Sequence, residues 1–345
     1  MIDAEPAVHR AIEFLTHAQL ADGEFKTVLG SDATLADGEW DSSPFVTSLV
    51  AYSLSHAGLA ARPLIERALS FLLSEMEPGG MWRYYTSKQF KHVRIPPDLD
   101  DTACASFVLV QNGKSLPSNR WIIMDNTDDR GLFRTWLIPT DGIGDRFRQV
   151  LSEGERIAEG KTPPMPEKYR ENRRFHSPKD PVPAGEVDAV VNANVVLYLG
   201  EGEETRPAIQ YLAKLVNAGP ENYASPYYTD ALTLYYMIGR ACLHSAPSLR
   251  QVGDQIARNI ERRHVENGSL GTPLLTALGV CALLTFAPDS AVLPPAIESL
   301  RHSQNEDGSW NRATFYRGPI EFWGSEALTT ALCVEALARY RRQRP

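Results

Sequence analysis

The sequence predicts an all-α fold, and two observations support this prediction. Apolar residues recur with helical spacing along most of the 345 residues, while the two-residue alternation of a β-strand is nearly absent. The expected helices are also of two kinds, amphipathic or apolar on every side, and the two kinds alternate along the chain. A helix that is apolar all round has to be surrounded by other helices, whereas an amphipathic helix keeps one face in water.

This alternation predicts a ring of helical hairpins. Outer, amphipathic helices are expected at 5–20, 61–76, 204–218, 248–266 and 291–304. Inner, apolar helices are expected at 43–58, 100–110, 187–200, 228–241, 272–286 and 325–340. Their spacing, roughly 40–55 residues where the chain is tightest, is typical of helical repeats. Six inner helices with outer partners predict a closed α6/α6 toroid, formed as a single domain by residues 1–345.

The segment 111–186 interrupts the regular spacing between the second and third inner helices. Within it, the stretch 144–160 is the candidate for the sixth outer helix. The basic, proline-rich stretch 161–183 follows, and it is typical of irregular surface structure. The interval as a whole is therefore expected to form a lid or a surface excursion.

Composition excludes several classes of protein. A net charge of -8 argues against a nucleic-acid partner, which would require a basic face. The four cysteines lie mostly in apolar runs, as core residues of a reducing compartment do. The acidic start has no apolar signal region, and no stretch approaches the ~20 apolar residues of a transmembrane helix. We therefore expect a cytoplasmic protein without a transmembrane segment, and the sequence leaves its oligomeric state open.

Two linkers share the pattern Gln-x-x-Asp-Gly-x-aromatic. They are "QLADGEF" at 19–25 and "QNEDGSW" at 304–310, each after an outer helix, with weaker echoes at 78–82 and 266–270. Glycine permits a tight exit from a helix, and the Gln and Asp side chains can satisfy free backbone groups. The aromatic residues of the two full copies, Phe25 and Trp310, are expected to pack against the next hairpin and to be structural.

The stretch "PPDLDDTACAS" at 96–106 crowds Asp98, Asp100 and Asp101 at the start of an inner helix. The simpler interpretation is capping, because Asp satisfies free backbone N–H groups and suits the positive end of the helix dipole. The alternative is a strong acid, since adjacent carboxyl groups retain a proton between them. The residues of this stretch alone do not decide between the two.

These motifs resemble those of the class II terpene cyclases, which include squalene–hopene cyclase and the diterpene cyclases. "QNEDGSW" resembles the Gln-Trp motif of that family, and "DLDDTA" at 98–103 matches its Asp-x-Asp-Asp-Thr-Ala acid motif. The preceding "PGGMW" at 78–82 resembles the family's Pro-Gly-Gly-aromatic segment. The resemblance spans residues 1–345 but covers one domain of a family whose full-length members have a second toroid. It implies a toroid and a cyclising isomerase that starts by protonating an isoprenoid alkene.

The resemblance also implies roles for four residues. Asp100 would be the general acid, tuned by Asp98 and Asp101. Asn194, in "VDAVVNANVVLYLG", falls where squalene–hopene cyclase carries the histidine partner of the acid. A carboxamide can donate a hydrogen bond to the carboxylate without competing for its proton. The alternative for Asn194 is a polar side chain satisfied by the backbone.

Two further groups complete the expected site. Aromatic residues near the mouths of the inner helices could line a carbocation cavity, although any single one of them is more often a core residue: Phe45, Trp82, Tyr227, Tyr228, Tyr316, Phe322 and Trp323. Basic residues beside the acid motif could hold a diphosphate, or form a solvated loop: Arg83, Lys88, Lys91, His92 and Arg94. The expected substrate is then a C15 or C20 prenyl diphosphate. No tightly bound cofactor or protein-held metal is expected, and Mg²⁺ would act by bridging such a diphosphate.

Three other functions stay open at this point. A non-catalytic toroid could bind a lipid or a protein partner and keep the acid motif for capping. A protein prenyltransferase subunit has the same toroid but a zinc site, and the nearest approach to one is "CLH" at 242–244. An α/α-toroid glycosidase would need two separated carboxylates in an open groove, which the apolar inner helices disfavour.

Overall fold

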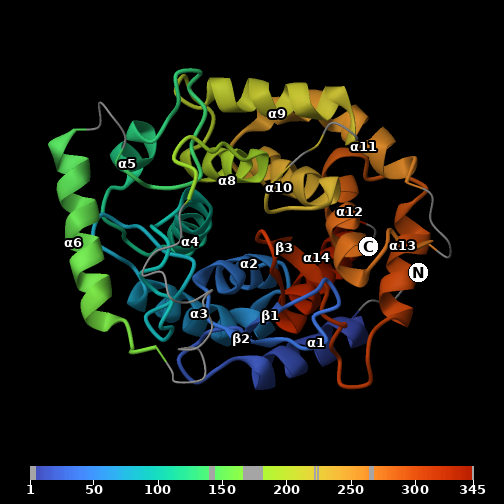
Figure 1. Cartoon of the computed structure of the whole chain (residues 1–345). Coiled ribbons are helices and arrows are strands. Elements are labelled where there is room, and N and C mark those ends of the chain that lie inside the picture. Colours follow the sequence, from blue (N-terminus) through green and yellow to red (C-terminus); the bar gives the residue numbers. More distant parts are fainter. Residues whose placement is uncertain are drawn as a thin grey trace.

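The computed structural model describes residues 5–139, 144–165, 182–220, 223, 225–263 and 268–343. Within these ranges the chain is mostly helical, with 13 α-helices and a small antiparallel sheet (Figure 1). The predicted predominance of helix is confirmed. The sheet was not predicted, so the expectation of a purely α-helical chain was wrong in this respect.

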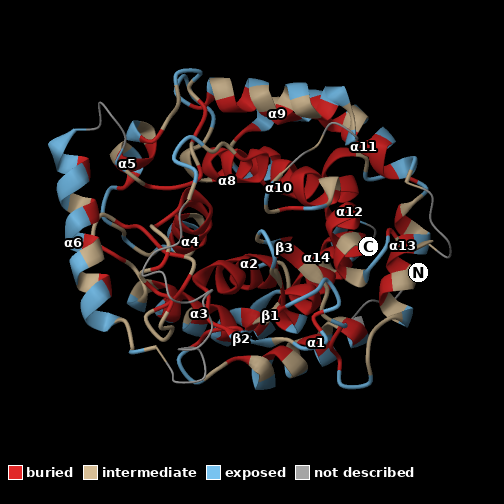
Figure 2. Cartoon of the chain, in the orientation of Figure 1, coloured by how far each residue is buried: buried red, intermediate tan, exposed pale blue. Residues whose placement is uncertain are grey.

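Six buried helices form a closed ring in which each packs against the next and the last packs against the first (Figure 1). They are α2 (Pro44–Leu54), α4 (Leu99–Gln111), α8 (Ala189–Leu199), α10 (Ala231–His244), α12 (Pro273–Phe286) and α14 (Glu326–Gln343). All six coincide with predicted inner helices, and Figure 2 shows them buried almost throughout. Helices α2 and α10 have their C-termini at the same end of the ring. Near these C-termini, the Tyr52 hydroxyl of α2 lies 3.0 Å from Nε2 of His244 on α10.

The outer helices keep one exposed face, as their amphipathic sequences require (Figure 2). They are α1 (Glu5–Ala18), α3 (Arg62–Ser74), α6 (Asp145–Lys161), α9 (Arg206–Ala218), α11 (Gly253–Glu261) and α13 (Leu293–His302). The helix expected at 144–160 is therefore present as α6. It packs on the short helix α5 (Arg120–Asp125), where the rings of Phe147 and Trp121 are 6.4 Å apart. Short 3-10 turns, η1 (Leu59–Ala61) and η4 (Pro247–Val252), precede α3 and α11.

The Gln-x-x-Asp-Gly-x-aromatic linkers fasten neighbouring outer helices to each other. Gln19, after α1, donates from Nε2 to the carbonyls of Gly23 and of Leu64 on α3, both at 2.9 Å. Gln304, after α13, donates in the same way to Gly308 and to Ala7 on α1, again at 2.9 Å. The second copy thus joins the last outer helix to the first and closes the outer layer.

The glycine and the aromatic residue of this linker also have defined tasks. Gly308 has φ +88° and lies so close to α1 that a Cβ would be 2.4 Å from the Arg10 carbonyl oxygen, which only glycine allows. The backbone N–H of Trp310 donates to Thr330 Oγ1 on α14 at 3.1 Å, and its indole Nε1 donates to the Leu300 carbonyl at 2.7 Å. Trp310 is fully buried, so its predicted structural role is supported by its contacts.

The sheet connects the first and last repeats at the point where the ring closes. It contains β1 (Thr27–Gly30), β2 (Glu39–Asp41), β3 (Thr314–Arg317) and β4 (Phe322–Gly324), in the order β2-β1-β4-β3. β1 pairs antiparallel with β4, with Val28 opposite Gly324. Strands of three or four residues are too short to show an alternation in sequence, so they escaped the sequence analysis. Because β2 leads into α2 and β4 into α14, the sheet lies at the N-terminal mouth of the inner ring.

The predicted excursion is only in part a surface feature. Within 111–186, residues 166–181 and 140–143 lie outside the described residues. The described segment around Phe133 and Trp136 is buried and runs beside the start of α4. Leu99 donates its backbone N–H to the Thr135 carbonyl at 2.8 Å, and Leu137 donates to Pro97 at 2.9 Å. This segment therefore helps to build the acid motif. No helix in the described ranges is both long and apolar enough to cross a membrane.

Candidate active site

Asp98 caps the helix that carries the acid motif. Its Oδ1 accepts the backbone N–H of Asp101 at 2.8 Å, and its backbone is extended as an N-cap requires. The capping interpretation of the three aspartates therefore describes Asp98. The side chains of Asp98 and Asp101 are nearly inaccessible, and Asp100 has the largest exposed fraction of the three, at 9%.

Asp100 is held by two donors from other inner-ring segments. Nδ2 of Asn194, from the middle of α8, donates to its Oδ1 at 2.7 Å. The hydroxyl of Tyr228, which lies just before α10, donates to its Oδ2. The predicted pairing of Asp100 with Asn194 is therefore present in the structure, and Tyr228 contacts the acid itself rather than only lining a cavity.

Burial and neighbouring charge keep protons on this cluster. Burial, followed by the charges of Asp98 and Asp188, raises the pKa of Asp100 to about 7, against the lowering effect of the two donors. Burial also raises the pKa of Asp98 to about 6, and burial with the adjacent Asp98 raises the pKa of Asp101 well above its usual value. With a pKa of about 7, Asp100 is about half protonated at neutral pH, and Asn194 and Tyr228 are placed to stabilise its ionised form.

A buried arginine stands behind Asn194. Nη1 of Arg240, on α10, lies 3.4 Å from Asn194 Oδ1, so it favours the amide orientation in which the NH₂ group faces Asp100. The guanidinium is 1% exposed and lies over the ring of Tyr52 at 4.2 Å and near that of Tyr236 at 5.8 Å. Sequence analysis missed Arg240, although an arginine in an otherwise apolar inner helix was a usable signal.

Replacing Asn194 by leucine is expected to lower the turnover number about 10- to 100-fold. The substitution removes a hydrogen bond that favours the ionised form of Asp100, a bond of about 1.5–3 kcal/mol, which matters if this group gives up a proton in catalysis. Steady-state kinetics of the purified variant measure the effect. Asn194→His keeps a ring N–H donor and should retain more activity than the leucine variant. Equal activity in wild type and the leucine variant would contradict a role for Asn194.

Aromatic rings gather between the acid and the sheet. Tyr228 packs edge-on against Phe315 at 5.8 Å, and Phe45 lies 6.3 Å from Phe315 and 5.7 Å from Tyr316. Tyr316 stacks on Trp323 at 5.6 Å, so the cluster continues from β3 to β4. Four predicted aromatic residues, Phe45, Tyr228, Tyr316 and Trp323, are thus brought together.

Two other predicted aromatic residues lie outside this cluster, and three unpredicted ones lie in or near it. Tyr227 is half-buried and packs edge-on against Trp136 at 6.0 Å, and Phe322 is half-buried on β4. Sequence analysis missed Phe315, Tyr84 and Trp136, and Tyr84 joins the cluster through a hydroxyl contact with Tyr316 at 2.7 Å. Phe315 is adjacent to a predicted residue in sequence, but its position on an unpredicted strand concealed it.

Trp82 does not belong to this cluster, and its prediction as a lining residue is corrected. It is fully buried, its backbone N–H donates to Thr102 Oγ1 at 3.1 Å, and its indole donates to the Leu72 carbonyl at 2.8 Å. These contacts match those of Trp310, which precedes α14, two inner helices away around the ring. The weak echo of the linker motif at 78–82 is therefore a structural copy of it.

The basic residues of segment 83–94 are occupied by the protein itself. Arg83 pairs with Glu77 at 2.6 Å, and Lys88 pairs with Glu24 at 2.6 Å and with Asp22. Lys91 pairs with Asp41 at 3.2 Å, while His92 Nδ1 lies 2.6 Å from the Tyr85 carbonyl oxygen. Arg94 is 5% exposed. A diphosphate, with or without Mg²⁺, would have to displace these contacts, so they do not favour the predicted diphosphate site.

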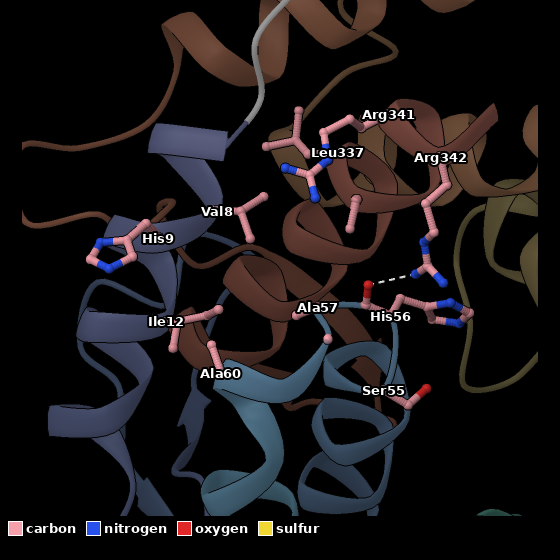
Figure 3. A pocket seen from close by; sticks show the side chains of 12 residues that line it. Val8, His9, Ile12, Ser55, His56, Ala57, Ala60, Leu337, Arg341 and Arg342 are labelled. Atoms are coloured by element: carbon pink, nitrogen blue, oxygen red, sulfur yellow. Dashed lines mark hydrogen bonds between the residues drawn. The ribbon is translucent and has the colours of Figure 1, made fainter. Parts of the chain in front are cut away.

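Figure 3 shows a pocket of about 270 Å³. It is lined near the C-terminal ends of α2 and α14, whereas the acid motif lies at the N-terminus of α4. Side chains of α1, of the turn after α2 and of the C-terminal half of α14 line it, among them Ile12, His56 and Leu337. Arg342 crosses its edge and donates to the His56 carbonyl at 2.5 Å. No residue of α4 lines this pocket, so it is separate from the acid site.

Comparison with known proteins supports a class II terpene cyclase-like fold. No protein-family profile matches the chain, and no curated protein matches its sequence. Among solved structures, a protein from Actinoplanes is similar with a TM-score of 0.72 and 19% identity, over 98% of this chain and 100% of that one. Type II terpene cyclase MstE from Scytonema has a TM-score of 0.70 and 16% identity, over 98% of both chains.

A larger cyclase is similar over part of its length. The ent-copalyl diphosphate synthase from Streptomyces platensis has a TM-score of 0.55 and 18% identity, over 86% of this chain and 50% of that one. MstE itself was solved with geranylgeranyl dihydroxybenzoate as its substrate. The similarity to MstE covers 98% of that chain, so a type II cyclase can have the extent of this chain.

Proposed function

We propose that this protein is a class II, protonation-initiated terpene cyclase whose double ring of helices is the α6/α6 toroid of that family. One observation carries the proposal: a buried Asp100, its pKa raised to about 7, is held by Asn194 and Tyr228 next to a cluster of aromatic rings. Capping needs one carboxyl group, which Asp98 supplies. It does not explain why Asp100, which caps no helix, accepts hydrogen bonds from two side chains of other segments.

In the proposed reaction Asp100 transfers its proton to the terminal double bond of an isoprenoid chain. A C–H bond forms, the carboxylate keeps the O–H electron pair, and a tertiary carbocation results. Internal double bonds then attack the cation to close rings, and loss of a proton or capture of water ends the cascade. Asn194 and Tyr228 donate to the new carboxylate and so lower the free energy of the ion pair.

The aromatic cluster supports the cationic steps. Ring faces attract cations, and a wall of Phe45, Phe315 and Tyr316 offers no strong nucleophile. Because Phe315 is only 3% exposed, its ring has to move aside when a substrate enters. The site therefore favours long apolar chains over small polar molecules.

Activity is expected to be highest below pH 7 and to fall as the pH rises through about 7. The reacting form of Asp100 is protonated, and its pKa lies near that value. The pH profile of kcat/KM measures this directly. Asn194→Leu should move the midpoint upward, because it removes a donor that favours the ionised form. An activity that rises through pH 7 would contradict the assignment of Asp100 as the acid.

The proposed substrate is a C15 or C20 prenyl chain, and the head group is the finer question. A prenyl diphosphate, with Mg²⁺ bridging its phosphates, is the expectation from sequence. The pairing of Arg83, Lys88 and Lys91 with carboxylates gives weight to a second candidate, a prenylated aromatic acid of the kind bound by MstE. Such a head group needs fewer free cations than a diphosphate.

Incubation with candidate substrates tests the proposal. Farnesyl diphosphate, geranylgeranyl diphosphate and geranylgeranyl dihydroxybenzoate are each supplied with and without Mg²⁺, and products are analysed by mass spectrometry, after phosphatase treatment for the diphosphates. A cyclic product of unchanged mass, or one hydrated, is expected from one of them. Binding without turnover of any substrate would overturn the proposal in favour of a lipid-binding toroid. Transfer of a prenyl group to a protein acceptor would instead indicate a prenyltransferase-like subunit.

A further inference from the structure

The proposed reaction, on which this inference rests, leaves the acid without its proton after each cycle. Asp100 gives a proton to the substrate, while the proton lost at the end of the cascade leaves from a different carbon. The three aspartates of the motif are 3–9% exposed and cannot exchange freely with water. A second turnover therefore requires a route by which a proton returns from solvent to the cluster.

Polar atoms without partners mark such a route beside Asp98. Asp98 and Trp136 lie opposite each other in an antiparallel bridge flanked by the hydrogen bonds of Leu99 and Leu137. This makes them a non-hydrogen-bonded pair, whose side chains lie close together on one face. Asp98 Oδ2 and Trp136 Nε1 are both buried and have no hydrogen-bond partner among the described residues.

The row of unpartnered atoms continues to Glu186. The backbone N–H of Thr135 donates to the Glu186 carbonyl at 2.8 Å, which places the two residues side by side. Thr135 Oγ1 and Glu186 Oε1 are likewise buried without a partner in the described ranges. The Glu186 carboxyl group interacts with Tyr227, Thr135 and Trp136. The negative charge of Asp98 in turn helps to raise the pKa of Tyr227.

Glu186 differs from the aspartates in its contact with water. The residue as a whole is half-buried and so lies partly in contact with solvent, whereas its Oε1 atom is buried. Burial raises its pKa above the usual value of a glutamate. Four inward-facing polar atoms from Asp98, Trp136, Thr135 and Glu186 also offer an ordered water the two to four partners that it needs.

We propose that Glu186 reloads the acid, passing a solvent proton through ordered water to the Asp98–Asp101 pair and from there to Asp100. In this step the Glu186 O–H bond breaks and an O–H bond forms on the Asp98–Asp101 pair. That pair gives up a proton to the Asp100 carboxylate, and Glu186 recovers one from hydronium. No oxidant or further reactant is needed. Glu186 never touches the substrate, so it is a proton-loading residue and not the general acid.

Kinetics of the first and later turnovers test this assignment in the full-length protein. Glu186→Gln enters the first turnover with a loaded Asp100, so its single-turnover rate should equal that of wild type. Its steady-state rate should fall by about 100-fold, the lower part of the range for a positioned proton-transfer group. Product should therefore appear as a burst of one equivalent per site. Glu203→Gln, a surface substitution next to α9 whose side chain is 91% exposed, is the control and should match wild type throughout.

Isotope exchange gives a second readout that does not depend on the slowest step. Protein equilibrated in H₂O is mixed into D₂O, aged for varied times, and given substrate for one turnover. Wild type should soon place deuterium on the product, whereas Glu186→Gln should place hydrogen for at least tenfold longer ageing times. Glu186→Asp, which keeps a carboxyl group, should recover part of the exchange rate and guards against a purely structural effect.

The outcomes separate the two proposals. A single-turnover rate that falls as far as the steady-state rate would overturn the proton-loading role, and so would wild-type exchange in Glu186→Gln. A wild-type protein that cyclises none of the substrates would overturn the proposed function and this inference with it.

Discussion

Replacing Asp100 with asparagine is expected to lower kcat/KM by about 10⁴-fold, the upper part of the range for a general acid. Asparagine has the shape of the protonated aspartate and can keep the contact with Tyr228, but it has no proton acidic enough for an alkene. No other described group has the same position, since Asp98 is committed to capping α4. Product formation measured by mass spectrometry gives the effect.

Stability shows whether this loss reflects chemistry or misfolding. The pKa of Asp100 is raised in the folded protein, so the folded state binds its proton more tightly than the unfolded state. The stability that this proton adds is fully present below about pH 4 and is lost as the pH rises through about 7. The Asp100→Asn variant should therefore be no less stable than wild type at pH 8. Asp254→Asn, an exposed aspartate in the first turn of α11, is the matched control and should retain full activity.

Substantial residual activity in Asp100→Asn would assign the acid to another group. In that case Asp98→Asn and Asp101→Asn would be compared next, because their pKa values are raised as well. A variant that is inactive and also clearly less stable at pH 8 would contradict the view that Asp100 is a strained, functional carboxyl group.

The second large effect concerns stability at the other end of the ring interior. Glu335, on α14, is fully buried and accepts hydrogen bonds from Arg339 at 2.9 Å, Tyr236 at 2.7 Å and Ser53 at 3.0 Å. Burial alone would raise its pKa, but His56 and Arg339 hold the pKa below the usual value, so the group is ionised. Its negative charge balances the positive charge of Arg339 and helps to raise the pKa values of both Arg339 and Arg240.

Glu335→Gln is expected to lower the free energy of unfolding by about 3–5 kcal/mol. The substitution leaves the Arg339 guanidinium buried without its carboxylate, and an uncompensated buried charge is strongly destabilising. Urea unfolding followed by circular dichroism measures the change. Glu326→Gln, at the exposed start of the same helix, should change stability by less than about 0.5 kcal/mol.

A double variant shows whether the effect comes from the unpaired arginine. Glu335→Gln combined with Arg339→Met removes both charges and should recover most of the lost stability, since buried ion pairs are often replaceable by apolar groups. A single variant as stable as wild type would contradict the buried-charge explanation. Additive losses in the double variant would do so as well.

The ion pairs of the basic segment join residues far apart in the chain, so they could not be read from its own sequence. Lys88 and Lys91 have no acidic neighbours nearby in sequence, which made them look available to a ligand. Their partners Glu24 and Asp41 are 64 and 50 residues away and reach them only because the first two repeats pack together. The same packing turned Trp82 from an apparent lining residue into a second copy of the Trp310 anchor.

The sequence by itself determined the parts of this protein that rest on local physics. Helical periodicity identified the six inner helices, because burial on all sides leaves an apolar pattern within each segment. The linker motif and the Asp98–Asp101 cluster were legible for the same reason, since caps and tight turns are made by residues next to each other in the chain.

Apart from Asn194, which the family resemblance placed beside the acid, only the tertiary structure decided what surrounds Asp100. Asp100 meets Asn194 across 94 residues and Tyr228 across 128, and both contacts exist because six helices close into a ring. Three more residues are brought near the acid only by folding: Arg240 behind Asn194, Phe315 on a short strand and Glu186 beside Trp136. Their distance from the acid motif along the chain leaves no local pattern to read, whereas ring closure brings them within contact of it.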